Sequence, residues 1–434
     1  MTNQQKYCAS IFSNSQRRTN FELMLLCALT IVVLPTAQAQ TFSAIYNFSG
    51  GQDGATPYAG LTMDKAGNFY GTTFSGGKGL GTVYRLKRSG SSWVADGLYS
   101  FRGGANDAAQ PLGRVSFGPD GSLYGTASVG GPGQFCGVGC GGVFKLQPPA
   151  TFCRSVSCPW IENVYLFGAI SEGEFPSGDL AFDEVGNLYG TTYLGGRDGG
   201  NIYELIPSGG GWTESVVHGF SGSDGLLPYG GAIFDSAGNL YGTTQEGGYD
   251  YRGTVFQFKR SGSGWTGTIL FEFQFAGDEG IYPSAGLIFD QAGNLYGATT
   301  AGGAGGGGAI FELSPAGGGW AVTLLYSFTG SKGANCPNPG NQYGGAGPWA
   351  SLAMDGAGSL YGTTLCDGAN HVGNVFKLSP SGAGWTYTLL HDFTGGDDGK
   401  YPISSVIVDA NGNLYGTASG GGSQGHGVVW EITP

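Results

Sequence analysis

The chain has 434 residues, of which 87 are glycine, and only 12% of its residues are charged, which excludes a helical bundle and a charged disordered tail. Apolar residues make up 40% and aromatic residues 13%, enough to build a buried core. The formal net charge of −12 argues against nucleic-acid binding, because phosphates would be repelled. The composition therefore indicates a turn-rich β protein.

Residues 1–39 have the pattern of a signal peptide. Three basic residues precede an apolar run from Leu23 to Leu34, and Ala37-Gln38-Ala39 supplies small residues for cleavage. We expect cleavage after Ala39 and export to the periplasm or the outside of the cell, which would change the net charge from −12 to −14. The alternative is a permanent membrane anchor, for which the apolar run is short. No later segment is apolar enough to span a membrane, so we expect no span after cleavage.

One string, Asp-x-x-Gly-Asn-Leu-Tyr-Gly-Thr-Thr, recurs along the rest of the chain. Each unit divides into four short strands, which in the fourth copy span 231–234, 239–244, 253–259 and 265–273. The middle strands are apolar on both faces, as strands packed between neighbouring sheets should be. The glycine after each tyrosine suggests a place where a neighbouring sheet comes close. The tyrosines of the seven copies are Tyr70, Tyr124, Tyr189, Tyr241, Tyr296, Tyr361 and Tyr415.

The two ends of the repeat complement each other. The last copy stops after its third strand, at Thr433, whereas residues 44–54 match the fourth strand and following loop of the preceding copy, residues 389–399. The N-terminal strand should therefore complete the last blade and close a ring. We predict an all-β fold, with residues 40–434 forming a single seven-bladed β-propeller of four-stranded antiparallel blades. The alternative is a tandem of separate small sheets, although one blade cannot bury both of its faces alone.

The repeat, with its Gly-Asn-Leu-Tyr-Gly-Thr-Thr, Gly-Gly and Gly-Thr-Val-Phe segments, resembles the GloVer tandem-repeat family of exported bacterial proteins. The resemblance covers all seven units. It implies an exported repeat protein and no particular activity.

Six cysteines follow the signal segment, and in an oxidising compartment they should form disulfides. Their placement in loops predicts the pairs Cys136–Cys140, Cys153–Cys158 and Cys336–Cys366. A zinc site is the alternative, but the Cys spacings are longer than in zinc knuckles and no histidine lies beside them.

The repeated acidic residues suggest structure more than chemistry. The Asp of each turn between the first and second strands should cap that turn. An acidic-Gly pair recurs in the loops between blades, but one carboxylate per loop falls short of a calcium site, so we predict no resident metal and no cofactor beyond a possible structural calcium ion. No nucleophile elbow or zinc-protease motif occurs, and we assign no catalytic residue.

The repeat is interrupted most strongly in residues 329–351 and in the loop 365–372 of the next unit. If both loops rise from one face, they would form a ridge that presents Tyr343, Trp349, Asp367 and His371, a combination suited to a glycan or a peptide. A solvated insertion with no ligand is the alternative, and the mouth of the central channel would then be the next place to look.

The sequence therefore favours an exported, non-catalytic binding propeller that recognises a glycan, a peptide or a cell-surface partner. The alternative is an extracellular hydrolase or lyase acting on a polysaccharide, with carboxylates converging near the axis, for which the candidates are Asp198, Glu246, Asp250 and Asp367. A channel mouth lined by paired carboxylates would favour the enzyme, and one lined by Thr, Ser and Gly would favour binding. The ligand and the oligomeric state are not specified by the sequence.

Overall fold

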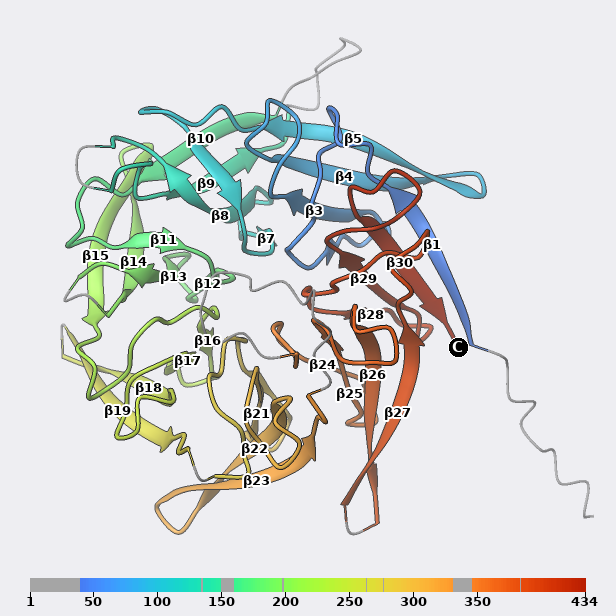
Figure 1. Cartoon of the computed structure of the whole chain (residues 1–434). Helices are drawn as coiled ribbons and strands as arrows, with labels where there is room; N and C mark the ends of the chain where they lie inside the picture. The colour runs from blue at the N-terminus through green and yellow to red at the C-terminus, as the bar shows by residue number, and fades with distance from the viewer. Residues whose placement is uncertain are drawn as a thin grey trace, which may run out of the picture. The chain divides into compact units, whose positions relative to one another are not determined.

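The computed structural model describes residues 40–133, 136–149, 160–196, 199–262, 264–275, 277–330, 346–382 and 384–434. The predicted signal segment and its cleavage site lie outside these residues. Residues 40–434 form one compact unit, in which seven antiparallel sheets are arranged around a central axis (Figure 1). The predicted seven-bladed propeller is confirmed. No helix of a length and hydrophobicity to cross a membrane occurs among the described residues.

Each blade contains four main strands. They run outward from the axis in chain order in blades 1 to 6, whereas the outermost strand of blade 7 comes from the start of the folded unit. The innermost strands are β2 (Thr62–Met63), β7 (Ser116–Phe117), β12 (Ala181–Phe182), β16 (Ile233–Phe234), β20 (Ile288–Phe289), β24 (Ala353–Met354) and β28 (Ile407–Val408). The second strands are β3 (Phe69–Thr73), β8 (Leu123–Gly130), β13 (Leu188–Leu194), β17 (Leu240–Thr244), β21 (Leu295–Thr299), β25 (Leu360–Thr364) and β29 (Leu414–Ala418). The third strands are β4 (Thr82–Ser89), β9 (Gly142–Gln147), β14 (Asn201–Ser208), β18 (Thr254–Ser261), β22 (Ala309–Ala316), β26 (Asn374–Ser381) and β30 (Val428–Thr433).

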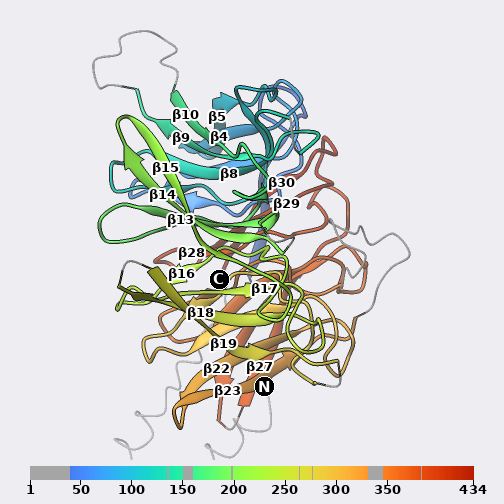
Figure 2. The same cartoon turned by 90° about the vertical axis from the view of Figure 1, so that its left-hand side faces the viewer.

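The outer strands are β5 (Ser92–Ser100), β10 (Ile161–Leu166), β15 (Gly211–Gly219), β19 (Gly264–Glu272), β23 (Gly319–Ser327), β27 (Gly384–Asp392) and, from the start of the folded unit, β1 (Thr41–Asn47). Two short strands, β6 (Ala108–Pro111) and β11 (Glu174–Pro176), add to the second strands of blades 2 and 3. The side view in Figure 2 shows the blades as stacked, twisted sheets. The four strands predicted for blade 4 agree with β16 to β19 to within two residues at each end.

Strand β1 closes the ring. This strand pairs antiparallel with β30, from Thr41 opposite Thr433 to Asn47 opposite Val428, so the sheet order of blade 7 is β1-β30-β29-β28. The Phe42 ring stacks on His391 of the neighbouring blade, with ring centroids 3.7 Å apart. The predicted closure is therefore confirmed, and it leaves blade 7 with the same four strands as the others.

The second strand of each blade is buried on both faces, as expected from its sequence. The glycine after the repeated tyrosine has a different role from the one expected. In blade 1, Gly71 lies opposite Tyr84 of the third strand, and a methyl group on Gly71 would lie 2.5 Å from the Tyr84 hydroxyl. The glycine therefore makes room for an aromatic ring of its own sheet, and not for a neighbouring sheet.

Neighbouring blades are joined by aromatic pairs and by hydrogen bonds. Tyr189 of β13 packs edge-on against Trp265 of the next blade, with centroids 5.9 Å apart. Thr243 donates a hydrogen bond to the Ala285 carbonyl of the next blade (2.8 Å), and Thr417 donates one to the Ala59 carbonyl across the closure (3.1 Å). Neighbouring blades are therefore joined by aromatic contacts farther from the axis and by hydrogen bonds close to it.

Two junctions at the rim hold carboxyl groups close together. Between blades 1 and 2, the Tyr99 hydroxyl donates to Asp107 (3.0 Å) and to Glu162, and burial together with the Asp107 carboxylate raises the pKa of Glu162 well above its usual range. Between blades 2 and 3, burial and the Glu172 carboxylate raise the pKa of Glu214 to about 7. Both junctions are therefore destabilised when these carboxyls ionise.

Candidate functional site

The segment that precedes each innermost strand has a proline, and these segments converge on the axis. The prolines are Pro57, Pro111, Pro176, Pro228, Pro283, Pro348 and Pro402. In six blades the residue before the proline is not glycine and has a φ of +56° to +63°, namely Thr56, Gln110, Phe175, Leu227, Tyr282 and Tyr401. Such a conformation is unusual for these residue types, and it must be held by the surrounding structure.

Hydrogen bonds to both neighbouring segments hold that residue in place. In blade 5, the Tyr282 amide donates to the Arg252 carbonyl of blade 4 (2.9 Å), and its carbonyl accepts from the Thr300 amide (3.1 Å). Tyr401 of blade 7 makes the equivalent pair with Val372 and Ser419. The strained residue therefore fixes the residue after the proline in a defined place at the axis.

The residues after the prolines form a ring around the channel. They are Tyr58, Leu112, Ser177, Tyr229, Ser284, Trp349 and Ile403, and a second ring two positions later consists of Gly60, Arg114, Asp179, Gly231, Gly286, Ser351 and Ser405. The channel between these rings has a cavity of only about 80 Å³. It is narrow because adjacent segments touch through their backbones: a methyl group on Gly231 would lie 2.4 Å from the Asp179 carbonyl oxygen.

The channel opens into a wider cavity of about 480 Å³, which we call the axial mouth. It lies on the side of the ring where the second strands end and the innermost strands begin. Its lining is mostly apolar and aromatic, and consists of Tyr58, Phe74, Gln110, Leu112, Ser128, Val129, Phe175, Ser177, Tyr193, Leu194, Tyr229, Gln245, Trp349 and Ile403.

Aromatic rings from four blades meet around the axial mouth. Tyr229 stands edge-on to Tyr193, with centroids 5.8 Å apart, and edge-on to Trp349, with centroids 6.3 Å apart. Tyr58 and Phe74 of blade 1 form another edge-on pair at 5.2 Å. Only 5% of the Trp349 surface is exposed, so this side chain is fixed by packing. The rings therefore offer apolar area at little entropic cost on binding.

The polar groups of the mouth are few and oriented. Gln245, of which 1% is exposed, donates through Nε2 to Ser284 Oγ (2.6 Å). Its Oε1 has no hydrogen-bond partner among the described residues, and an unpaired buried acceptor is costly. This acceptor is itself buried, so it lies in the wall of the mouth and not at its surface.

The only charges along these two cavities in the described residues neutralise each other. Arg114 Nε lies 3.2 Å from Asp179 Oδ2, and the Arg114 amide donates to Asp179 Oδ1 (2.8 Å). Burial and the Glu246 carboxylate raise the pKa of Tyr193 to about 12, and burial raises the pKa of Tyr229 to about 12. The phenols are therefore neutral at physiological pH, and the two charged side chains that line the channel are paired with each other.

The structure describes three of the four residues predicted to form a ridge, and it packs Trp349 in one cluster with Leu365 and Cys366 of the second predicted loop. Tyr343 lies outside the described residues. Trp349 lines the axial mouth and is buried instead of standing on an exposed ridge. Asp367 is half buried, and burial followed by the Asp392 carboxylate raises its pKa. His371 is exposed in a turn, with φ +56°. Of the described three, Trp349 alone lines the mouth, because the residue after each proline points to the axis.

The carboxylates considered for a polysaccharide-cleaving site do not line the mouth where they are described. Asp198 lies outside the described residues. Glu246 interacts with Arg252, and Asp250 accepts a hydrogen bond from the Phe275 amide (3.4 Å). The paired carboxylates that hydrolysis would require are therefore not found at the axis among the described residues.

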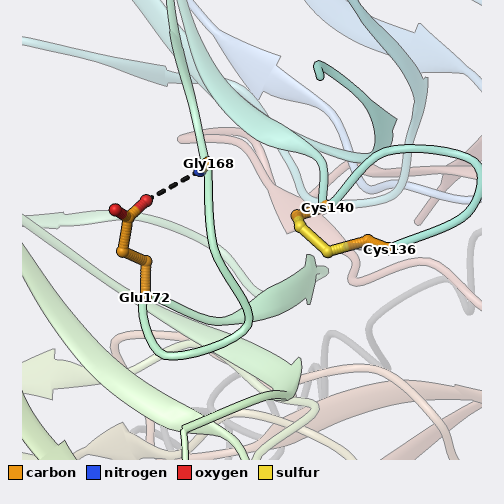
Figure 3. Close-up of a disulfide and its surroundings, with 4 residues drawn as sticks. All are labelled: Cys136, Cys140, Gly168 and Glu172. Atoms are coloured by element: carbon orange, nitrogen blue, oxygen red, sulfur yellow. Dashed lines mark hydrogen bonds between the residues drawn. A yellow bond between two sulfur atoms is a disulfide. The ribbon is translucent and has the colours of Figure 1, made fainter. Parts of the chain in front are cut away.

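The structure joins Cys136 to Cys140 in the loop between β8 and β9, with Cα atoms 5.1 Å apart (Figure 3). The Cys140 carbonyl accepts the amide of Phe175, a residue of the axial mouth (3.0 Å), so this loop supports the mouth. Cys366 is also disulfide-bonded. Its predicted partner Cys336 and the predicted pair Cys153–Cys158 lie outside the described residues.

The repeated acidic residues cap turns. Glu172 accepts the Gly168 amide at 2.7 Å, as Figure 3 shows, and Asp398 accepts the Thr394 amide at 2.8 Å in the equivalent loop. In the turn between the first two strands of blade 4, Asp235 accepts hydrogen bonds from Ala237 and Asn239. No group of three or more His, Cys, Asp or Glu side chains placed to hold a metal ion occurs in the described part of the chain.

Comparison with solved structures supports the fold. The extracellular domain of a Bacteroides thetaiotaomicron protein, described as a hybrid two-component system, superposes with a TM-score of 0.52 at 12% identity, over 90% of this chain and 39% of that one. This chain thus spans about two fifths of that structure. A Bacteroides uniformis protein described as a 6-phosphogluconolactonase gives a TM-score of 0.47 at 15% identity, over 79% of this chain and 85% of that one. A gluconolactonase from Xanthomonas campestris gives 0.37 at 15% identity, over 63% and 75%.

No curated protein matches the sequence significantly. The model of the Gloeobacter/Verrucomicrobia repeat matches residues 30–229, 139–345 and 336–434, which together cover all seven blades. The seven-fold repeat, the closed ring and this match lead to one conclusion: the chain belongs to the Gloeobacter/Verrucomicrobia repeat family.

Proposed function

We propose that the protein is an exported binding protein that holds a neutral carbohydrate in the axial mouth. The observation that carries the proposal is the lining of the mouth: rings of Tyr193, Tyr229 and Trp349 beside the unpaired acceptor of Gln245. The signal-like residues 1–39 support export.

The lining matches the chemistry of a sugar ring. A pyranose has a face of C–H groups, which packs against the negative face of an aromatic ring, and hydroxyls at its edge. One such hydroxyl could donate to Gln245 Oε1 if this buried side chain turns toward the mouth and gives up its hydrogen bond to Ser284. Neutral ligands are favoured because Arg114 and Asp179 already neutralise each other and the chain as a whole is acidic. An anionic polymer would be repelled.

Hydrolysis is the less favoured function. A glycosidase needs two carboxyl groups about 5 to 10 Å apart on either side of the bond to be broken. Among the described residues that line the mouth and channel, Asp179 is the one carboxylate, and its ion pair with Arg114 disfavours it as a proton donor.

The test is a binding screen of the folded unit, residues 40–434, against an array of neutral glucans, mannans, galactans and xylans. Product analysis in the same wells separates binding from cleavage. We expect binding without release of sugar fragments, and a loss of about fivefold or more in affinity for Tyr229→Ala, since ring stacking contributes roughly 1 kcal/mol or more. Gln245→Leu should weaken binding by a similar factor.

Tyr229→Phe is the matched control, because it keeps the ring and should lose less affinity than Tyr229→Ala. Equal affinities for the wild type, Tyr229→Ala and Gln245→Leu would move the ligand away from the axial mouth. Accumulating fragments would favour the hydrolase.

A further inference from the structure

The loops of blade 4 expose three large aromatic side chains on the ring face that carries the axial mouth. Tyr249 is 80% exposed and Tyr251 61% exposed, both in the loop between β17 and β18, and Phe275 is 73% exposed in the loop after β19. We call these three residues the blade 4 patch. Large exposed aromatic groups cost solvation free energy, and their concentration on one blade of seven calls for a physical reason.

The two loops that carry the patch contact each other. Asp250, between the two tyrosines, accepts the Phe275 amide (3.4 Å). The Arg252 guanidinium lies 5.1 Å from the centroid of the Phe275 ring and 5.3 Å from that of Tyr282, and it donates to the Tyr282 hydroxyl. The two loops are therefore held together by a cation stacked between rings, a fixed arrangement that suits a binding platform.

Tyr251 occupies a position that favours glycine. Its φ is +56°. In the matching seven-residue loops of blades 5 and 7 the equivalent residues are Gly306 and Gly425, with φ of +79° and +77°, and in blade 6 the equivalent is His371, with φ of +56°. A tyrosine pays a conformational cost there that glycine avoids. Burial does not repay this cost, because the side chain is mostly exposed. Strain kept at an exposed site is typical of a residue retained for function.

The loop that carries two residues of the patch starts at the axial mouth. The loop that carries Tyr249 and Tyr251 begins at Gln245, a residue of the mouth, and its Arg252 carbonyl accepts the amide of Tyr282, two residues before Ser284 of the channel ring. The carboxylate of Glu246, the residue after Gln245, helps to raise the pKa of the Tyr193 hydroxyl in the mouth. One ligand could therefore contact both surfaces.

We infer that the blade 4 patch is a second subsite for the ligand of the axial mouth, so that the ligand is a chain of several neutral sugar units and not a single sugar. This inference rests on the function proposed above. Successive sugar rings would stack on Tyr249, Tyr251 and Phe275 while one end of the chain occupies the mouth. An extended peptide is the competing occupant. A polymer of neutral sugars fits better because the lining of the mouth is mostly aromatic and the two charged side chains of the adjoining channel, Arg114 and Asp179, pair with each other.

The test compares chain lengths. Affinities of the wild type, Tyr251→Gly, Phe275→Ala and Tyr229→Ala are measured by calorimetry against a size series of the neutral glycan that binds on the array, from the disaccharide to long oligomers. We expect wild-type affinity to rise with length. Tyr251→Gly and Phe275→Ala should flatten that rise and weaken binding of the longest oligomer about tenfold each.

Thermal unfolding of the same variants separates function from structure. Tyr251→Gly removes strain, so its Tm should equal or exceed that of the wild type although binding is weakened, an outcome that a structural role for Tyr251 would not give. Val185→Ala is the control, because Val185 is 83% exposed in a turn of blade 3 on the opposite face of the ring.

The results can contradict the patch as a subsite without contradicting the axial mouth as the binding site. If Tyr229→Ala weakens binding at every length while both patch variants bind the longest oligomer as tightly as the wild type, the patch is not a subsite and the mouth remains the site. If Tyr229→Ala has no effect at any length, the proposed function fails with it. Patch-dependent binding of unmodified peptides, with none of neutral glycans, would overturn the carbohydrate assignment.

Discussion

The turns at one end of the blades and the axial positions at the other differ in how far the repeat is kept. The turn between the first two strands is nearly the same in every blade: in blade 4, Asp235 takes hydrogen bonds from Ala237, Asn239 and the Tyr241 hydroxyl. The residue after each proline, by contrast, is Tyr, Leu, Ser, Tyr, Ser, Trp or Ile. Every blade needs the same turn between its first two strands. The axial side chains make no contact that recurs in every blade, so they are free to vary and to bind a ligand.

The comparison predicts that repeated features govern stability. The largest effect is expected from removal of residues 40–54, which contain β1. The deletion exposes the edge of β30 and removes Phe42 from its stack on His391. We expect the Tm to fall by more than about 10 °C because a closed ring becomes an open one. Comparable Tm values by differential scanning calorimetry would contradict the role assigned to β1.

A substitution at Gly231 tests whether the glycines that line the channel are needed for stability or for ligand binding. Gly231→Ala would place a methyl group 2.4 Å from the Asp179 carbonyl oxygen of the adjacent blade. We expect a loss of about 2 to 3 kcal/mol in urea unfolding, as in other overpacked sites. Gly356→Ala is the control, since nothing lies within 4 Å of an added methyl there. Equal losses of unfolding free energy in the two variants would show that the close approach at Gly231 does not contribute to stability.

The repeated turn itself is tested by Asp235→Ala. The change removes the acceptor of four hydrogen bonds, and we expect a loss of about 1 to 3 kcal/mol in the free energy of unfolding. Affinity at the axial mouth should be unaffected, because the turn lies at the other end of the blade. A variant with wild-type stability and weakened binding would contradict the assignment of the turn to stability and of the axial residues to binding.

The smallest effect concerns the carboxyls of the rim. The folded pKa of Glu214 is about 7, above its ordinary value of 4.5, so the folded state keeps the proton longer. The contribution is complete below about pH 4.5 and is lost as the pH rises through about 7. Glu214→Gln should therefore raise stability at pH 8 by about 1 kcal/mol, a modest figure because solvent screens this partly exposed group.

The same substitution should have no stabilising effect at pH 4, where the carboxyl of the wild type is protonated. Thermal melts of both proteins across this range give the measurement. Parallel pH profiles would mean that Glu214 ionises freely in the folded state.

The fold could be predicted closely because its signals are local and repeated. Gly238-Asn239-Leu240-Tyr241 specifies a turn and a buried strand within a few residues, and six similar strings repeat that information. The match between residues 44–54 and 389–399 revealed the closure. The role of Gly71 was misassigned because the sequence does not give the strand register, and the ring that it accommodates belongs to Tyr84 of the same sheet.

The candidate site was harder to predict. Pro228 and Tyr229 are visible in the sequence, but the residue after the proline is of five different types in the seven blades, and the seven positions become neighbours only when the ring closes. Trp349 was selected as part of an interrupted loop, whereas its place at the axis follows from Pro348. A search for a repeated proline followed by varied residues could have found the ring.

Closure by β1 also sets the order of folding. Thr41 must wait for Thr433, which the ribosome adds almost four hundred residues later, so the first strand of the propeller has no partner until synthesis is nearly complete. Contacts this distant in sequence form slowly, and an unpaired strand is prone to aggregate meanwhile. We therefore expect β1 to need protection from aggregation until the last strand is available. Any premature stop within β30 would leave a protein with a permanently exposed sheet edge.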